Sequence, residues 1–239
     1  MAYRPSPLKI IGNVIRTLLY SLIALMVAFL VWRIWFSTKM PENIKKLNIN
    51  PTLSEAYAAA DGQLYAFDQP QEEFTRGEDN YGYFSIEDYV IIPDARQVQI
   101  VFRYNNSTVE KLVEDFPELV TEIPDRRQQL YEVTLVKTTD LTPENEEDND
   151  SPLARSETRY EPTEIITEYT LLYTFHRIVF DNVEIGEDDI ALFADIYYTG
   201  AVDYEELPYG SICLYDNQMR NRDYEFDKAD LKRLEKSIK

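Results

Sequence analysis

The sequence predicts a mainly β protein in which a single N-terminal transmembrane helix is followed by an antiparallel β-sandwich, one or two short helices and a C-terminal helix. Three observations support this prediction. An almost unbroken apolar run occupies residues 17–36, period-two alternation of apolar and polar residues recurs in the 200 residues after residue 39, and strands do not alternate with helices as a parallel sheet requires. An immunoglobulin-like strand order is one topology for such a sandwich, and the sequence leaves it open.

Changes in composition along the chain set the boundaries of these parts. About 20 residues at a rise of 1.5 Å span roughly 30 Å, the thickness of the hydrocarbon core of a bilayer. No Pro/Gly/Ser-rich linker divides the remainder, which therefore forms one domain. The predicted parts are a cytoplasmic tail (1–15), the transmembrane helix (16–36), a polar stem (37–51), the β-sandwich domain (52–226) with an acidic loop (140–156), and a C-terminal helical tail (227–239).

The apolar run is typical of a retained signal anchor. A cleaved signal peptide has an apolar core of about 7–15 residues followed by small residues at the cleavage site. Here the run is longer and ends in bulky residues from Phe29 to Phe36. A helix in the core of a soluble protein would have polar residues every three or four positions, and residues 22–32 have none.

The ends of this helix have residues that suit the two membrane interfaces. Aromatic rings settle at the level of the headgroups, and long basic side chains reach past them to water. The residues expected there are Arg16, Tyr20, Trp32, Arg33, Trp35 and Phe36. Membrane lipid is therefore the expected partner of the helix.

Orientation depends on more than the flanking charges, because the basic residues on the two sides nearly balance. A short N-terminal tail normally stays inside while a large following domain is exported. We therefore expect a single-pass protein of the cell membrane with a cytoplasmic N-terminus and an extracytoplasmic C-terminal domain.

Charge is divided sharply along the chain. Residues 1–39 have five basic residues and no acidic one, so the total of −19 leaves −24 on residues 40–239. A domain this acidic repels phosphate backbones, which excludes nucleic acid as a partner. The single cysteine, Cys213, excludes an intramolecular disulfide.

Two short helices and a C-terminal helix are expected. Residues 51–60 form the first, with Thr52 as the N-cap and Gly62 as the stop, and residues 108–116 form the second. Asp227 caps the C-terminal helix, which we expect to be a loosely docked terminus; contact of its basic face with anionic headgroups is the alternative.

The clearest strand has Val98, Ile100, Phe102 and Tyr104 on one face, alternating with a mostly polar second face, and is predicted to be half-buried. It pairs in a hairpin with residues 83–92 across a turn that begins at Pro93. About seven or eight strands are expected in all. The others occupy residues 129–137, 163–173, 175–180, 190–198 and 209–215.

The acidic loop has no apolar residue over residues 144–150. A solvated loop is the plain interpretation. A calcium site is the alternative, because clustered carboxylates are hard oxygen ligands, although the spacing does not match an EF-hand loop.

No catalytic residue and no cofactor site is predicted. One histidine and one cysteine, His176 and Cys213, are too few for a transition-metal site, and both are expected to be packing residues rather than a Cys–His nucleophile pair. The chain has no phosphate-binding or serine-hydrolase motif. Whether the acidic loop binds a metal stays open.

Tyrosines suggest a binding surface. Tyr197, Tyr204 and Tyr209 gather late in the chain and could form an exposed face for a protein or a sugar, although Tyr is also a favoured strand residue. The leading hypothesis is a non-enzymatic extracytoplasmic module that binds a protein or envelope component. The alternatives are an envelope hydrolase that uses paired carboxylates, an accessory subunit of a membrane complex, and a receptor that signals through a partner helix.

Overall fold

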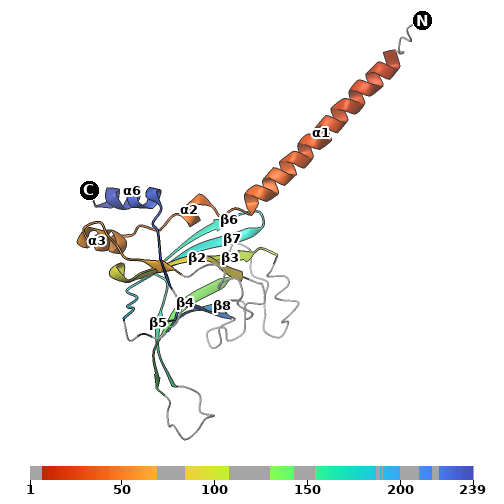
Figure 1. Ribbon diagram of the computed structural model, residues 1–239. Coiled ribbons are helices and arrows are strands. Elements are labelled where there is room, and N and C mark those ends of the chain that lie inside the picture. Colours follow the sequence, from red (N-terminus) through yellow and green to blue (C-terminus); the bar gives the residue numbers. More distant parts are fainter. Residues whose placement is uncertain are drawn as a thin grey trace.

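The computed structural model describes residues 7–68, 84–107, 130–142, 154–186, 189, 191–199, 210–216 and 221–238. A long helix, α1 (Pro7–Ser37), projects from a body that is built of two antiparallel sheets (Figure 1). We call this body the two-sheet domain. The prediction of a mainly β protein with a long apolar N-terminal helix and a C-terminal helix is confirmed.

Helix α1 is exposed along its length. Every large hydrophobic side chain from Ile11 to Phe36 is between 49 and 68 % exposed. It is the one helix in the described part of the chain that is long and apolar enough to cross a membrane, and its most apolar stretch buries nothing against the domain. In water such a surface would aggregate, so α1 is compatible with a membrane anchor.

The first sheet has six strands. In order across the sheet they are β10 (Arg222–Asp223), β1 (Phe67–Asp68), β2 (Phe84–Ile92), β3 (Gln97–Asn105), β7 (Tyr173–Asp181) and β6 (Glu164–Tyr169). The predicted hairpin is confirmed as β2 and β3, which are joined by a 3-10 turn (Pro93–Ala95) and by Arg96 in the left-handed region at φ 49°.

The second sheet has four strands, β5 (Ala154–Tyr160), β4 (Tyr131–Thr142), β8 (Ala191–Tyr198) and β9 (Gly210–Asp216). β4 and β5 extend into both ends of the predicted acidic loop, which is therefore shorter than expected. Most of that loop, the predicted helix 108–116, and Tyr204 and Tyr209 lie outside the described residues.

One hydrophobic core joins the inner faces of the two sheets. It includes the predicted inward face of β3, with Phe102 packed against Tyr131 of β4 at a ring-centroid distance of 5.7 Å. Phe84 of β2 contacts the same Tyr131 ring at 5.7 Å. The period-two pattern of β3 thus identified the core side correctly.

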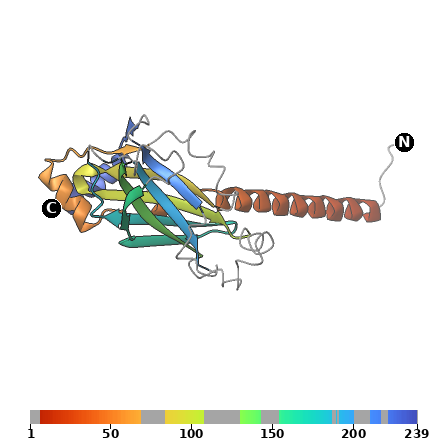
Figure 2. The ribbon, with the colours of Figure 1, turned by 90° about the horizontal axis from the view of Figure 1, so that it is seen from below.

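The other face of β3 is also buried, so the prediction of a half-buried strand was wrong. Gln99 is 0 % exposed, and Gln97 and Val101 are buried as well. Residues 38–60 and the C-terminal helix cover this face. The covering helices are α2 (Glu42–Lys45), α3 (Pro51–Ala59) and α6 (Lys228–Ser237), which form a third layer outside the six-stranded sheet (Figures 1 and 2).

Helix caps differ in one case from the prediction. Asn50, not Thr52, caps α3: its Oδ1 accepts a hydrogen bond from the Leu53 N–H at 3.0 Å, and Pro51 occupies the first helical position. Asp227 caps α6 as predicted, by accepting from the Ala229 N–H at 3.2 Å.

Candidate functional site

The segment that connects α1 to α3 is packed on the six-stranded sheet. We call residues 38–50 the junction segment; most of the predicted polar stem falls in it. Ile44 and Leu47 are 0 and 1 % exposed. Ile44 packs with Val101 and Phe175, and Leu47 packs in a cluster that includes Leu234 of α6. The segment is therefore part of the domain and does not act as a solvated tether.

Arg177 of β7 holds the short helix α2. Its Nε donates to the carbonyl oxygen of Ile44 at 2.6 Å, and its Nη2 donates to that of Lys45 at 3.0 Å. These carbonyls belong to the last turn of a helix and have no intrahelical partner of their own. Its Nη1 donates to Oε1 of Gln99 at 3.0 Å, so each of the three guanidinium nitrogens donates a hydrogen bond.

The side-chain amide of Gln99 on β3 forms two hydrogen bonds with the backbone of Asn48, in the way that the backbone of a neighbouring strand would. The Asn48 N–H donates to Oε1 of Gln99 at 2.9 Å, and Nε2 of Gln99 donates to the Asn48 carbonyl oxygen at 2.7 Å. Gln97 extends the network, because its Nε2 donates to Oδ1 of Asn50 at 3.0 Å and to Oδ1 of Asp181 at 2.8 Å. The buried side-chain amide of Gln99 thus satisfies both backbone polar groups of the half-buried Asn48.

Helix α6 holds the neighbouring residue in the same way. The Leu47 N–H donates to Oδ2 of Asp230 at 3.1 Å, and Nη1 of Arg233 donates to the Leu47 carbonyl oxygen at 3.0 Å. Nη1 of Arg233 also lies 2.8 Å from Oδ1 of Asp230. With Leu234 buried beside Leu47, the C-terminal helix is docked on the junction segment, and the expectation of a loose terminus was wrong.

Charges on this face compensate one another. Burial lowers the pKa of Arg177, while the carboxylates of Asp88 and Asp230 raise it. Burial raises the pKa of Asp88, and Arg177 opposes that rise. We call Arg177, Gln99, Asp230 and Arg233 the junction clamp. Its chemistry is that of attachment, because each of these four side chains hydrogen-bonds to the backbone of the junction segment.

The C-terminal end of α1 is joined to the domain. The Ser37 side chain is mostly buried, and the Thr170 hydroxyl lies 3.0 Å from the Ser37 carbonyl oxygen. Lys39 places its ammonium 3.5 Å from the centroid of the Trp35 ring, a cation–π contact.

The six predicted interface residues are all exposed on α1. Trp32 contacts Phe36, with 5.7 Å between the ring centroids, and Arg33 lies between them in sequence. Nearer the N-terminus of the helix, Nε of Arg16 donates to the Tyr20 hydroxyl at 3.0 Å.

Of the three tyrosines in the predicted binding face, Tyr197 is the one that lies in the described residues. Tyr197 is 6 % exposed, and burial raises the pKa of its hydroxyl. A side chain this covered does not offer a ring for stacking. Tyr204 and Tyr209 lie outside the described residues.

His176 and Cys213 lie in different sheets, on β7 and β9. Nδ1 of His176 is 2.8 Å from the Thr167 hydroxyl, and its ring stacks on Tyr104. Burial raises the pKa of Cys213 to about 11, so its thiol stays protonated at neutral pH and is a poor nucleophile. Among the described residues, no group of three or more His, Cys, Asp or Glu is placed to hold a metal ion.

The burial of His176 predicts acid sensitivity. Burial lowers its pKa from 6.5 to about 4 in the folded protein. Between these values the unfolded chain binds the proton more readily, so stability is complete above about pH 6.5 and falls as the pH drops towards 4, by about 3 kcal/mol for this group.

The measurement is urea unfolding of the wild type and of His176→Gln across that pH range. The difference in stability between the two proteins should change by that amount. A constant difference would contradict the neutral buried histidine.

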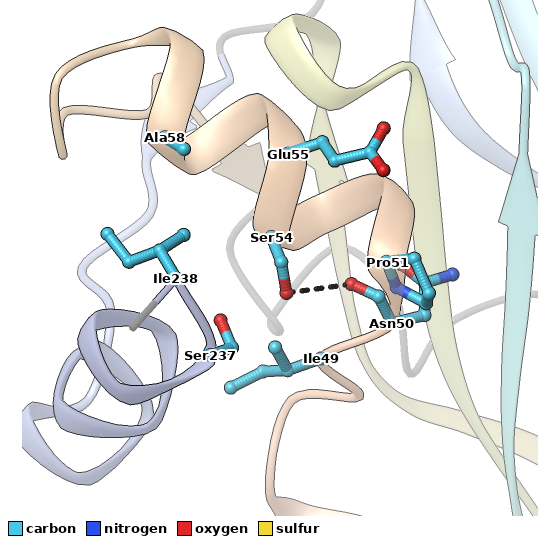
Figure 3. A pocket seen from close by; sticks show the side chains of 8 residues that line it. All are labelled: Ile49, Asn50, Pro51, Ser54, Glu55, Ala58, Ser237 and Ile238. Carbon is cyan, nitrogen blue, oxygen red and sulfur yellow. Dashed lines mark hydrogen bonds between the residues drawn. The ribbon is translucent and has the colours of Figure 1, made fainter.

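A shallow groove of about 510 Å³ lies between α3 and α6 (Figure 3). The hydroxyl of Ser54 is engaged with the carbonyl oxygen of Asn50 at 3.0 Å, and Glu55 is its one charged lining residue. The groove is too open and too poor in converging polar groups for a catalytic site. Its lining residues are Ile49, Asn50, Pro51, Ser54, Glu55, Ala58, Ser237 and Ile238.

Comparison with models of protein families, with curated proteins and with solved structures found no match. The site must therefore be interpreted from its geometry. Sequence reasoning missed the junction clamp. The one available signal was the polar outer face of β3, where Gln97 and Gln99 stand at alternate positions, and this was assigned to solvent.

Proposed function

We propose that the chain is a single-pass protein of the cell membrane, with a cytoplasmic N-terminus and an extracytoplasmic β-sandwich that binds a protein partner at the same membrane. The observation that supports it most is the bare apolar helix α1 joined to a domain through a clamped segment. In this proposal the domain has no catalytic role, and the two sheets form a sandwich whose immunoglobulin-like order stays a prediction.

The clamp favours a partner at a fixed height above the bilayer. A flexible linker would let the domain sample a wide volume, whereas Arg177 and Gln99 hold the junction segment on the sheet. A pre-oriented domain loses less rotational freedom when it meets a partner that is itself held in the membrane. This geometry suits an accessory subunit of a membrane complex.

The net charge of the domain indicates the kind of partner surface that it would bind. The strong negative charge of residues 40–239 repels anionic lipid and nucleic acid and attracts a basic protein surface. The hydrolase alternative stays a prediction without specific support, because the buried carboxylates Asp68 and Asp230 are each bound by an arginine, Arg222 and Arg233.

Cross-linking in intact membranes tests the proposal. A flexible Gly-Ser insertion between Thr38 and Lys39 frees the domain from α1 but leaves both intact. We expect a cross-link to a membrane-embedded partner in the wild type, loss of it with this insertion, and its retention when the same insertion precedes Pro7.

Orientation is tested in parallel by protease treatment of intact cells. Digestion of the domain is the expected result. A protected domain, or a cross-link that is indifferent to the junction insertion, would contradict the proposal.

A further inference from the structure

We propose that the turn between β6 and β7 (residues 170–172) lies in the interfacial layer of the same bilayer, where Tyr169 and Leu171 form a second membrane contact beside α1. The inference rests on the proposed membrane anchor. The ligand is the headgroup and upper acyl-chain region of the lipid.

The turn is bonded to the end of the anchor helix. The Thr170 hydroxyl lies 3.0 Å from the Ser37 carbonyl oxygen and 2.9 Å from that of Tyr173, and it shares its proton between them. The Tyr173 N–H donates to the same hydroxyl at 3.0 Å. The β6–β7 hairpin therefore reaches the base of α1, as Figure 1 shows.

Depth follows from this bond. Ser37 comes directly after the aromatic residues Trp32, Trp35 and Phe36, which belong at the level of the headgroups when α1 spans a bilayer. From Trp32 to Ser37 the helix rises only about 7.5 Å. A turn within hydrogen-bond distance of Ser37 therefore lies at the interface.

Composition of the turn agrees with this depth. Tight turns in water favour Gly, Pro, Asn and Asp, but here the sequence is Thr170, Leu171 and Leu172. Four large hydrophobic side chains of the described residues after Phe36 are strongly exposed, and two of them, Tyr169 and Leu171, lie at this turn, each 52 % exposed. Lipid would cover them.

The local charge is also compatible with lipid headgroups. Lys39 stacks on Trp35, and the Arg103 guanidinium lies 4.6 Å from the centroid of Tyr173, so two cations flank the turn. Two carboxylates nearby offset these cations: Glu87 pairs with Arg103 at 2.8 Å, and Glu168 accepts from the neutral amide of Asn43 at 3.0 Å and keeps its charge. The four named charges sum to zero, so this end of an acidic domain is locally neutral and does not repel zwitterionic headgroups as the whole domain repels anionic ones.

Two contacts would fix the tilt of the domain on the membrane. A single helix leaves the domain free to lean, whereas a helix and a turn define one edge that faces the lipid. The opposite ends of these strands, near Arg96 and Asp181, would then point away from the bilayer.

An environment-sensitive probe tests the contact. In a Cys213→Ser background, Leu171→Cys and Tyr65→Cys are labelled with a nitrobenzoxadiazole dye in phosphatidylcholine vesicles that contain lipid with a nitroxide headgroup. Tyr65 is the matched control, because its side chain is as exposed as that of Leu171. The Tyr65 N–H donates to the Asp94 carboxylate at the β2–β3 turn, which lies at the end of β3 opposite the β6–β7 turn. Eight residue steps of strand separate the two ends by about 26 Å.

The expected result is a blue-shifted emission from the probe at residue 171. The nitroxide should quench this probe at least about twofold more strongly than the probe at residue 65, because the separation of about 26 Å between the two ends of β3 exceeds the thickness of the headgroup layer. Equal quenching at both positions in a chain that stays in the vesicles would overturn the inference but not the anchor. Release of the chain by carbonate would overturn both.

Discussion

Replacing Arg177 with methionine is expected to destabilise the two-sheet domain by about 3–5 kcal/mol, because three acceptors lose a hydrogen bond from a charged donor and each unsatisfied acceptor costs about 1–3 kcal/mol. The substitution keeps the apolar stem of the side chain but removes all its donors. The carbonyl oxygens of Ile44 and Lys45 and Oε1 of Gln99 each lose a hydrogen bond. Asp88 also loses the nearby cation that opposes the rise in its pKa.

Thermal unfolding in detergent is the measurement. A domain of this size should lose about 2–4 °C per kcal/mol, so the midpoint should fall by about 6–20 °C. Arg159→Met is the matched control, since that arginine is exposed and lies 3.7 Å from Glu157. An exposed pair contributes less than about 1 kcal/mol, and its loss should hardly move the midpoint.

A second readout separates the clamp from general stability. The amides of Leu47 and Asn48 donate to Asp230 and Gln99, so they should be protected from hydrogen exchange in the wild type. In Arg177→Met both should exchange faster than amides in the centre of β8. Unchanged protection would show that the junction segment is held without Arg177.

Lysine at both Leu25 and Phe29 is expected to abolish membrane retention. Near the centre of a spanning helix each lysine costs about 2.5–3.5 kcal/mol, and each lost apolar residue removes a further few tenths. These two residues are 68 and 55 % exposed on α1. The combined free-energy cost is about 6 kcal/mol. Snorkelling of the lysine side chains cannot offset it, because both positions are far from either membrane interface.

Carbonate extraction followed by sedimentation measures the effect. The double lysine variant should move to the supernatant, while Leu25→Val with Phe29→Leu should stay in the pellet. The unfolding midpoint of the domain in detergent should be the same in both, because the most apolar stretch of α1 buries nothing against the described domain. Retention of the lysine variant would disprove anchoring through α1.

The strongest sequence predictions were those that depend on local pattern. In a bilayer an apolar run of membrane length must satisfy its own backbone as a helix, and α1 is present as expected. The β2–β3 hairpin was predicted from period two and from Pro93, because these signals act between neighbours in the chain. Asp227 as a cap is local in the same sense.

The junction clamp could not be found this way. Arg177 and Ile44 are 133 residues apart, and Gln99 and Asn48 are 51 apart. A polar residue at every second position of a strand normally indicates water on that face. Here backbone groups of the distant junction segment take the place of water beside Gln97 and Gln99. Hydrogen bonds between these side chains and that backbone leave no periodic pattern in the sequence of either segment.

The sequence by itself determined the apolar helix, the acidic β domain and the inward face of β3, because each follows from the solvent preference of residues close together in the chain. Only the tertiary structure decided that the outer face of the six-stranded sheet is covered, that the C-terminal helix is docked, and that α1 ends on the β6–β7 turn. Those outcomes depend on which backbone groups and side chains meet after folding, since a buried glutamine or arginine is stable only where specific partners complete its hydrogen bonds.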